Sequence, residues 1–361
     1  MDEKKIAFII CMNDDKYVKE CIYYIQSLLI PEGYEIDILT ISDAESMCAA
    51  YNAAMNNTNA KYKIYLHQDV FLLNQNILYE ILEIFQDPKV GIIGVVGADK
   101  LPSHAKAIEA WNYGNVLLCH GNHLQQVKSF GTDDDPVITV DAIDGMLMIT
   151  QYDLYWDDNT FNGFDFYDIS QCMEFRKHGW KIVLPKSENV WVLHDYGISS
   201  EISYNKYRKK FCEKYESYGF HYDEADEDIC ARKISHFETA KQNVLKALNE
   251  NNTADVKKAL QIFEANGYMD TEVFYIKNYT DIIEKNKNLK IKWPEFQEYF
   301  DHIKFNLWKL QFRNETEEDF LTEIRTGKLP LEVLQEIMQH CIIDQNIMWK
   351  KLLENMQRFR F

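Results

Sequence analysis

The residues of this sequence that are best suited to chemistry are polar and acidic side chains placed directly after short apolar runs. Such runs predict buried strands, and the ligands of open α/β sheets bind outside the carboxyl ends of the strands. The polar groups at the first three strand ends are Asn13, then Ser42 with Asp43, then His67 with Gln68 and Asp69. We therefore expect these side chains to share one ligand site.

The distribution of arginine limits how such a site could bind phosphate. Lys and Arg together number 39, but the first arginine of the chain is Arg176. A diphosphate bound by the N-terminal half therefore cannot be held by the planar fork of an Arg side chain. Lysine, helix N-termini or a divalent metal must neutralise its charge instead.

Common motifs with a known mechanism are absent from the sequence. It has no GxGxxG, GxxxxGK[ST], GxSxG or HExxH pattern, and Gly91, Gly94 and Gly97 fit close strand packing better than phosphate binding. The acidic run Asp133–Asp135 directly precedes Pro136, which is typical of a turn. We interpret this run as a solvated loop rather than a second acidic site.

Strand and helix patterns alternate through the first half of the chain. Continuous apolar runs predict covered strands, and apolar residues at helical spacing predict helices. The expected strands are Lys5–Met12, Tyr34–Ile41, Lys61–Leu66 and Val90–Val96, and the expected helices are Tyr17–Leu29, one after Ser42, and Ile77–Phe85. Ser42 and Glu45 have the spacing of a capping box for the second helix. This order predicts an α/β fold with a doubly wound, mostly parallel sheet.

The pattern changes twice beyond residue 98. The next expected elements are two strands within Val137–Thr150 around an Asp144-Gly145 turn, a helix at Asp168–His178 ended by Gly179, strands at Trp180–Leu184 and Val190–His194, and a helix at Tyr204–Tyr218. The acidic segment Tyr222–Asp228 resembles a linker, and nearly everything after Cys230 predicts helix. We expect an α/β domain over residues 1–220 and an all-helical domain over residues 229–361.

The overall composition excludes several classes of protein. The net charge of −18, from 39 basic and 57 acidic residues, disfavours binding to nucleic acid. The eight cysteines form no CxxC pair, which fits reduced thiols in a cytoplasmic protein rather than a disulfide framework or a zinc site. The longest apolar runs, Ile6–Met12 and Ile92–Ala98, are far shorter than the roughly 20 residues of a membrane span. We expect a cytoplasmic location.

The order of several short motifs resembles glycosyltransferase family 2, whose members have the GT-A fold. The matching segments run from Lys5 to Gly197, and their order is more specific than any single segment. They are Met12-Asn13-Asp14, Cys21–Leu29, Met47–Asn52, Tyr62–Phe71, Gly91–Gly97, Asp144-Gly145, Tyr167–Lys181 and Val192–His194. The chain looks closest to a bacterial branch with a Leu-His-Gln-Asp-Val segment in place of the family's DXD motif.

This resemblance implies a divalent metal, Mn²⁺ or Mg²⁺, that holds a nucleoside diphosphate sugar. By position, Asp69 corresponds to the last acidic residue of the DXD motif and would bind the metal and the diphosphate. His67 would be a metal ligand or a sugar contact, unless it only packs beside the sheet; Gln68 would lie beside the donor, and His194 could complete the metal shell. The alternatives are that Asp69 only caps the helix near Asn76 and that His194 is a structural residue.

Further donor and acceptor contacts follow from the same resemblance. Ser42 and Asp43 stand at the strand end where the family holds the nucleoside, and Asn13 ends the first strand beside them. Asp144 and Gly145 lie where the family shapes the acceptor side. A simple turn is the alternative for Asp144.

The family's catalytic element is an acidic residue that opens a helix before a Gly-aromatic-Lys turn. Asp168 holds this place ahead of Gly179–Lys181, and the resemblance makes it the general base. A sugar hydroxyl has a pKa far above 7, so a carboxylate must take its proton as the new bond forms. The alternatives are that Asp168 is only a helix N-cap, or that nearby Asp165, on the acceptor side, is the base.

Together these features imply an inverting glycosyltransferase of cell-surface polysaccharide synthesis, acting on a hydroxyl of a glycan or lipid-linked acceptor, with a UDP-linked donor favoured. Because His67 and Ser170 depart from the family pattern, the alternative is an inactive sugar-nucleotide or glycan-binding module. The C-terminal helices would recognise the acceptor or a partner. The basic, amphipathic Met348–Phe361 could rest peripherally on an anionic membrane, but docking on its own domain is favoured.

Overall fold

The computed structural model describes residues 1–120, 123–132, 134–196, 201–222, 239–250, 252–265, 271–285, 291–313, 315, 316 and 318. The chain divides into two compact units. Unit 1 comprises Met1–Leu118, Gln125–Asp195 and Ser199–Ala231, and unit 2 comprises Cys119–Leu124, Tyr196–Ile198 and Arg232–Phe361. The predicted linker Tyr222–Asp228, apart from Tyr222, and the predicted end helix Met348–Phe361 lie outside the described residues.

Strands and helices alternate up to residue 214, as the sequence pattern predicts. In chain order they are β1 Asp2–Met12, α1 Asp15–Gln26, β2 Glu35–Ser42, α2 Met47–Asn56, β3 Ala60–His67, β4 Val70–Leu72, α3 Ile77–Ile84, β5 Val90–Ile93, β6 Val96–Ala98, a 3₁₀ turn Ala107–Glu109, β7 Tyr113–His120, β8 His123–Ser129, β9 Val137–Val140, β10 Ala142–Ile143, β11 Leu147–Thr150, α4 Tyr167–Lys177, β12 Lys181–Pro185, β13 Val192–Asp195 and α5 Glu201–Lys214. A second 3₁₀ turn follows at Glu216–Tyr218.

The central sheet has seven strands in the order β2-β1-β3-β11-β5-β12-β9. β1 pairs in parallel with both β2 and β3, and the register sets Met12 beside Ser42 and Cys11 beside His67. The carboxyl ends of these three strands therefore meet at one edge of the sheet. β11 runs antiparallel to β3 and β5, so the sheet is mixed beyond its parallel half. A second, six-stranded sheet has the order β10-β6-β7-β13-β4, with β8 paired to β7.

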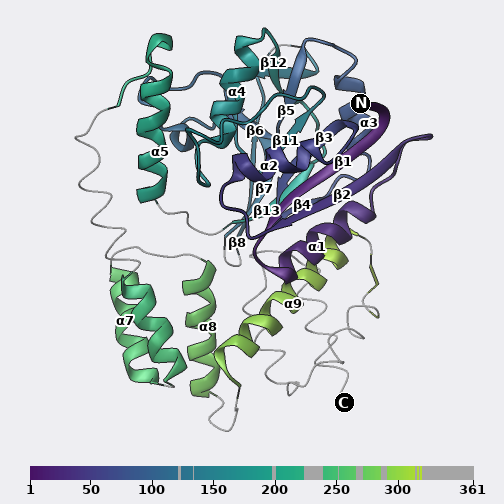
Figure 1. The fold of residues 1–361 in the computed structure, drawn as a ribbon. Coiled ribbons are helices and arrows are strands. Elements are labelled where there is room, and N and C mark those ends of the chain that lie inside the picture. Colours follow the sequence, from purple (N-terminus) through teal and green to yellow (C-terminus); the bar gives the residue numbers. More distant parts are fainter. Residues whose placement is uncertain are drawn as a thin grey trace. The chain divides into compact units, whose positions relative to one another are not determined.

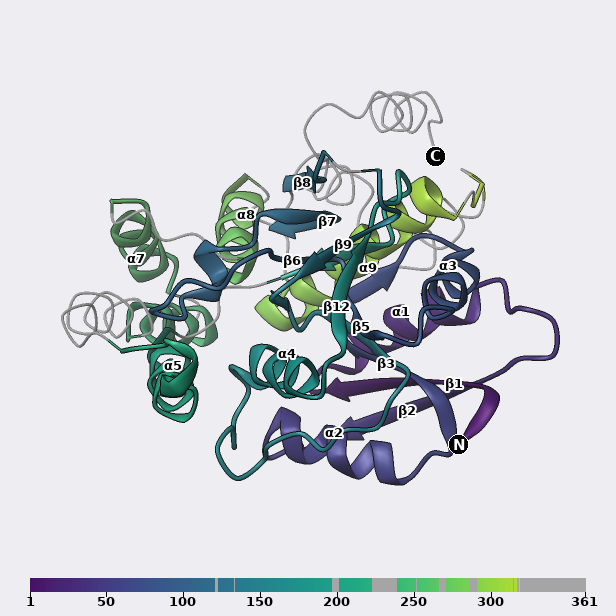
Figure 2. The same cartoon turned by 90° about the horizontal axis from the view of Figure 1, so that it is seen from above.

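Helices cover both faces of the central sheet. α1 and α3 lie on one side of β1, β2 and β3, and α2 and α4 lie on the other (Figures 1 and 2). α1 begins at Asp15 because the side chain of Asp14 accepts hydrogen bonds from the backbone N–H groups of Lys16 and Tyr17. The α/β class predicted from the sequence is confirmed.

Two local predictions were wrong. The expected strand Val90–Val96 is two strands in different sheets, β5 and β6, separated at Gly94. A Cβ atom on Gly94 would lie 2.6 Å from a side-chain atom of Ile143, so the glycine permits a close crossing, as its packing role predicts. The expected capping box is also absent, because Ser42 ends β2 and it is Ser46 that caps α2 through Ala49 N–H.

The described C-terminal residues are helical, as predicted. Residues 239–249 form one helix, followed by α7 Thr253–Ala265, α8 Thr271–Lys285 and α9 Trp293–Phe312. Their core includes Ile276 of α8 with Phe296 and Phe300 of α9, all of them fully buried. Among the described residues, no helix combines the length and the apolar composition that spanning a membrane requires.

Candidate functional site

A pocket of about 500 Å³ opens at the carboxyl ends of β1, β2 and β3. Its lining is Cys11, Met12, Asn13, Asp15, Ser42, Asp43, Ala44, Met47, His67, Gln68, Asp69 and Phe164. All six residues that the sequence predicts at the donor are in this set. The convergence follows from the parallel register of the three strands, since each strand ends at the same edge of the sheet.

Two backbone features shape this edge. Asp43 has a φ of 53°, a left-handed conformation that turns the chain sharply as β2 ends. The side-chain oxygen of Gln68 accepts hydrogen bonds from the N–H groups of Asn13 and Asp14, at 2.9 and 3.0 Å. The amide nitrogen of Gln68 in turn donates to the side chain of Asn13. Gln68 thus links the loop after β1 to the end of β3. The side chains of Asn13 and Gln68 both line the pocket.

Asp69, His67 and His194 form a cluster that could hold a metal ion. Oδ1 of Asp69 lies 3.5 Å from Nε2 of His194 and 4.0 Å from Nδ1 of His67. The three ligand atoms lie within 4.8 Å of one another. β13 contributes His194, and the turn between β3 and β4 contributes Asp69. The alternative role of Asp69 as a helix cap is wrong. The N-cap of α3 is Asn76, and no side chain makes a capping hydrogen bond at this helix start.

The chemistry of this cluster fits a divalent cation. Two imidazole nitrogens and one carboxylate oxygen suit first-row divalent ions, including Mn²⁺. Oδ1 of Asp69 is buried and accepts no hydrogen bond from the described residues, which leaves its lone pairs available. The pocket lining also contains Asp15 and Asp43 but neither Lys nor Arg, so a cation would meet no competing positive side chain.

The two histidines of the cluster differ in basicity. Burial lowers the pKa of His67, so its imidazole is neutral and able to bind a metal near pH 7. Burial acts in the same direction on His194, but the carboxylates of Asp69, Asp144 and Asp195 together outweigh it and raise the pKa of His194. Burial would raise the pKa of Asp69, yet His194, His67 and a backbone hydrogen bond together outweigh this effect and lower it. A metal ion binding here would displace a proton from His194.

Tyr167, the first residue of α4, contacts the imidazole of His67 on the side opposite to Asp69. Its hydroxyl oxygen lies 2.5 Å from Nε2 of His67, which leaves Nδ1 facing Asp69. The residue beside the Tyr167 hydroxyl must be a glycine, because a Cβ atom on Gly145 would lie 2.1 Å from the Tyr167 hydroxyl oxygen. Tyr167 is a site residue that the sequence pattern did not predict. Its adjacency to Asp168 was the available signal.

Asp168 is half-buried in the first turn of α4. Oδ2 accepts a hydrogen bond from Gly145 N–H at 2.9 Å, and Oδ1 accepts one from Ile169 N–H at 2.8 Å. Burial, together with the charge of Asp144, raises the pKa of Asp168 to about 7. The cap hypothesis is wrong, because the N-cap of α4 is Phe166, whose φ is 64°.

The two other predicted acceptor-side carboxylates are placed differently. Oδ1 of Asp144 accepts a hydrogen bond from Met146 N–H at 2.9 Å, as a turn aspartate does. Its charge nevertheless acts on His67, His194 and Asp168, so it lies among the predicted site residues. Burial raises the pKa of Asp165, although the neighbouring Ser203 of α5 acts to lower it. The third predicted acceptor-side residue, Gly145, donates its backbone N–H to the Asp168 carboxylate and so orients it.

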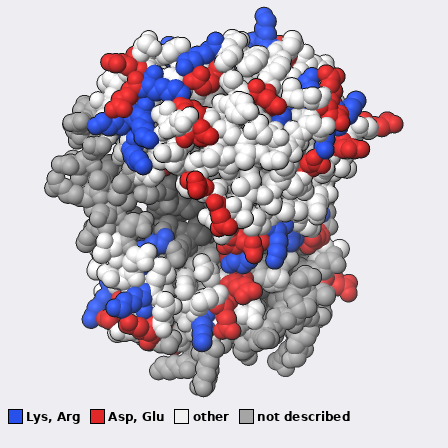
Figure 3. Space-filling view, viewed as in Figure 1, with Lys and Arg blue, Asp and Glu red and all other residues white. Residues whose placement is uncertain are grey.

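Positive side chains gather away from the pocket lining. On the face drawn in Figure 3, Lys and Arg cluster over the region of α5. Lys206 and Lys214 of α5 are exposed, whereas Lys209 and Lys210 are half-buried. None of these lysines lines the pocket. Metal binding and helix N-termini therefore remain the ways to neutralise a bound diphosphate there.

The chain is similar to known glycosyltransferases at two levels. Residues 7–215 match the model of a glycosyltransferase-like family. No curated protein sequence matches the chain. Solved structures that are similar include the mannosyltransferase PcManGT from Pyrobaculum calidifontis in complex with GDP-Man and Mn²⁺, at 11% identity and a TM-score of 0.37, covering 73% of this chain and 76% of that one.

Two more similar structures are transferases with bound donors. TarS of S. aureus in complex with UDP-GlcNAc has 10% identity and a TM-score of 0.37, covering 79% of this chain and 87% of its own. A Drosophila β-1,4-galactosyltransferase 7 complex with manganese, UDP-Gal and xylobiose has 12% identity and a TM-score of 0.30, covering 53% and 71%. Similarities this low say nothing about the substrate of the present chain.

Proposed function

The chain belongs to the glycosyltransferase-like family, and we propose that it is an inverting, metal-dependent transferase using a nucleoside diphosphate sugar. A UDP-linked donor is favoured, and the acceptor is a hydroxyl of a glycan or lipid-linked molecule in cell-surface polysaccharide synthesis. We also propose a cytoplasmic location, peripheral membrane contact through Met348–Phe361, and acceptor or partner recognition by the helical domain over residues 229–361.

This proposal rests on one observation: two members of the metal-ligand cluster, His67 and Asp69, line the pocket, and the third, His194, lies 3.5 Å from Asp69. His67 and Asp69 line the β3 side, and Ser42 and Asp43 line the β2 side of the same pocket. A nucleoside diphosphate has an anionic end and a neutral base, and the pocket offers a metal-ligand set for the first and polar strand ends for the second. The arrangement therefore supports a donor lying across the ends of the three strands.

Asp69, His67 and His194 would hold the metal. When bound, a divalent cation neutralises the diphosphate and stabilises the leaving group as the glycosidic bond breaks. The protein residues set the geometry of that site. Tyr167 fixes the imidazole of His67 so that Nδ1 faces Asp69; a hydrogen bond to the other ring nitrogen commonly orients a histidine that binds a metal.

Asp168 is the proposed general base. The acceptor oxygen attacks the anomeric carbon, the carbon–oxygen bond to the diphosphate breaks, and the hydroxyl proton passes to the Asp168 carboxylate. A pKa of about 7 leaves the carboxylate about half ionised at neutral pH and makes it a stronger base than an ordinary aspartate. Its bond from Gly145 N–H fixes the direction of the remaining lone pairs.

Release of nucleoside diphosphate from a panel of nucleotide sugars tests this function. The wild-type protein with Mn²⁺ should cleave at least one donor, and faster when a suitable acceptor is added. Asp69→Ala should lose the reaction, whereas Asp134→Ala, at an exposed loop position, should keep it. Tight donor binding without any cleavage would instead identify the inactive sugar-nucleotide-binding module.

A further inference from the structure

Phe164 is a large apolar side chain that remains exposed at the pocket. It lines the pocket, and 55% of its surface is accessible to solvent. Leaving a phenylalanine ring in water forgoes the stabilisation that its burial would give. An exposed ring at the edge of a ligand pocket is therefore suited to a ligand with a flat, apolar face.

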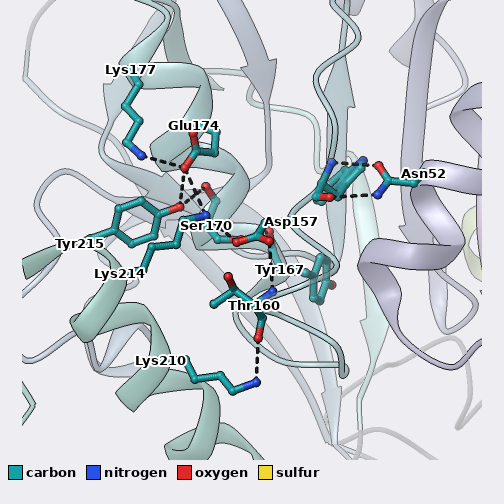
Figure 4. A network of polar contacts seen from close by, with 11 residues as sticks. Asn52, Asp157, Thr160, Tyr167, Ser170, Glu174, Lys177, Lys210, Lys214 and Tyr215 are labelled. Carbon is teal, nitrogen blue, oxygen red and sulfur yellow. Dashed lines mark hydrogen bonds and ion pairs between the residues drawn. The ribbon is translucent and has the colours of Figure 1, made fainter.

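Phe164 lies in a segment, residues 156–164, that is fixed to α5 on one side. Figure 4 shows Lys214 and Lys210 of α5 reaching Asp157 and Thr160 of this segment. Nζ of Lys214 lies 2.6 Å from Oδ2 of Asp157, and Nζ of Lys210 donates to the Thr160 carbonyl at 2.9 Å. The side chain of Asn162 accepts further hydrogen bonds from Lys210 and from the hydroxyl of Tyr207, at 3.2 and 3.1 Å.

The same segment is fixed to α2 on the other side. Met47 N–H, at the start of α2, donates to the Gly163 carbonyl at 3.0 Å. The side chain of Asn52 exchanges hydrogen bonds with the backbone of Trp156, each 2.9 Å long. Gly163 has no room for a side chain, because a Cβ atom would lie 2.4 Å from the Tyr207 hydroxyl oxygen. These bonds fix the backbone that leads up to Phe164, so the position of the ring at the pocket is well defined.

The bond from Met47 places Phe164 near the β2 side of the pocket. Met47 follows Ser42 and Asp43 closely in the chain, and all three line the pocket with Phe164. β1 separates β2 from β3, and neighbouring strands lie about 4.8 Å apart, so the β2 end is roughly 10 Å from the metal-ligand end at β3. From the end of β1 to the start of α1, the lining residues are Cys11, Met12, Asn13 and Asp15, none of which is aromatic.

We propose that Phe164 is a stacking platform for the nucleobase of the donor. This inference rests on the proposed function, since it takes the pocket ligand to be a nucleoside diphosphate. With the diphosphate at the β3 end, the base reaches the β2 end, where the Phe164 side chain is exposed. Stacking tolerates any base, so Phe164 contributes affinity, while the polar ends of β2 remain free to choose among bases.

Calorimetry on Phe164→Leu and Phe164→Trp tests this role. Leucine keeps an apolar side chain without a ring, and tryptophan keeps a flat ring. With Mn²⁺ present, Phe164→Leu should weaken UDP binding by at least about fivefold, and Phe164→Trp should retain it. Binding of Mn²⁺ with inorganic pyrophosphate, which has no base, should be equal in all forms. Tyr155→Leu is the matched control, because Tyr155 is similarly exposed just before the same segment and does not line the pocket.

Results that contradict the stacking role of Phe164 differ from the result that contradicts the proposed function. Unchanged UDP affinity in Phe164→Leu would overturn the stacking role. A loss of pyrophosphate binding as large as the loss of UDP binding would also overturn it, because it would show that the segment itself had moved. A loss confined to the sugar-linked donor, with UDP unaffected, would also overturn it and place the sugar at the ring. If wild-type protein bound no nucleoside diphosphate from a panel of UDP, GDP, CDP and ADP, the proposed function itself would fail.

Discussion

Nε2 of His67 and the hydroxyl oxygen of Tyr167 lie 2.5 Å apart, which joins the end of β3 to the first residue of α4. The contact links the two halves of the proposed site. His67 belongs to the metal-ligand cluster, and Tyr167 precedes the proposed base, Asp168, in the chain. Burial raises the pKa of Tyr167 well above its ordinary value, so its hydroxyl stays protonated and remains a hydrogen-bonding partner of the imidazole.

Tyr167→Phe removes this contact and keeps the ring. The imidazole of His67 loses the partner that fixes its orientation, so we expect metal affinity to fall roughly 10–100-fold, as is usual for outer-shell changes. Titration with Mn²⁺, followed by its electron paramagnetic resonance signal, measures this affinity. Tyr207→Phe is the control, because its hydroxyl bonds Asn162 and not the cluster. Equal Mn²⁺ affinity in Tyr167→Phe and wild type would show that this contact does not support the metal site.

Donor binding should require a divalent cation. The pocket lining has three aspartates and neither Lys nor Arg, so a free diphosphate would be repelled. Calorimetry with UDP should show binding with Mn²⁺ and little or none with EDTA. Asp69→Ala should abolish the metal-dependent part, and Asp134→Ala should leave it unchanged. Identical UDP affinities with Mn²⁺ and with EDTA would exclude the metal from donor binding.

The rate of transfer should depend on pH through Asp168. A general base works only when deprotonated, and the pKa of Asp168 is raised to about 7. At saturating donor and Mn²⁺, we expect kcat to be nearly constant above pH 7 and to fall about tenfold per pH unit well below it. An acidic limb centred near pH 4 would mean that an unperturbed carboxylate, and not Asp168, is titrating.

The stability of the protein should show the cost of keeping Asp168 in its site. In the unfolded chain an aspartate titrates near pH 3.9, whereas in the folded state Asp168 titrates at about 7. The ionised group therefore destabilises the fold progressively between these values and by a constant amount above pH 7. Asp168→Asn carries no such charge, so it should gain more stability over wild type at pH 8 than at pH 5.

Urea denaturation at both pH values measures the difference, with Asp134→Asn as the exposed control. The control should stay close to wild type at each pH, as surface substitutions usually do. A destabilised Asp168→Asn at pH 8 would show that the carboxylate holds the fold together rather than serving catalysis.

The sequence predicted most of the pocket because parallel strands bring their carboxyl ends together by geometry alone. Asn13, Asp43 and Asp69 could be placed at one edge from three apolar runs, without any knowledge of loop conformation. The family resemblance added His194, which lies far along the chain but within 3.5 Å of Asp69.

Loop conformation was the part that the sequence pattern could not predict. Phe164 enters the pocket because its segment is held by lysines of α5 and by Met47, contacts that no periodicity encodes. The break between β5 and β6 at Gly94 is similar, since it depends on Ile143 passing close to the backbone. Capping at Ser46 instead of Ser42 reflects where β2 ends, which its pairing with β1 determines.

The transfer rate of Asp168→Asn, measured together with donor affinity, tests the central claim most directly. Asn keeps the size of the side chain and an oxygen for the bond from Gly145 N–H, but it cannot take the acceptor's proton. We expect kcat to fall by roughly 10²–10⁴-fold while the Kd for UDP with Mn²⁺ stays within about twofold of wild type. Asp165→Asn, which removes the alternative carboxylate, should remain active. Full activity in Asp168→Asn, or loss of UDP binding in that variant, would contradict the role of Asp168 as the base.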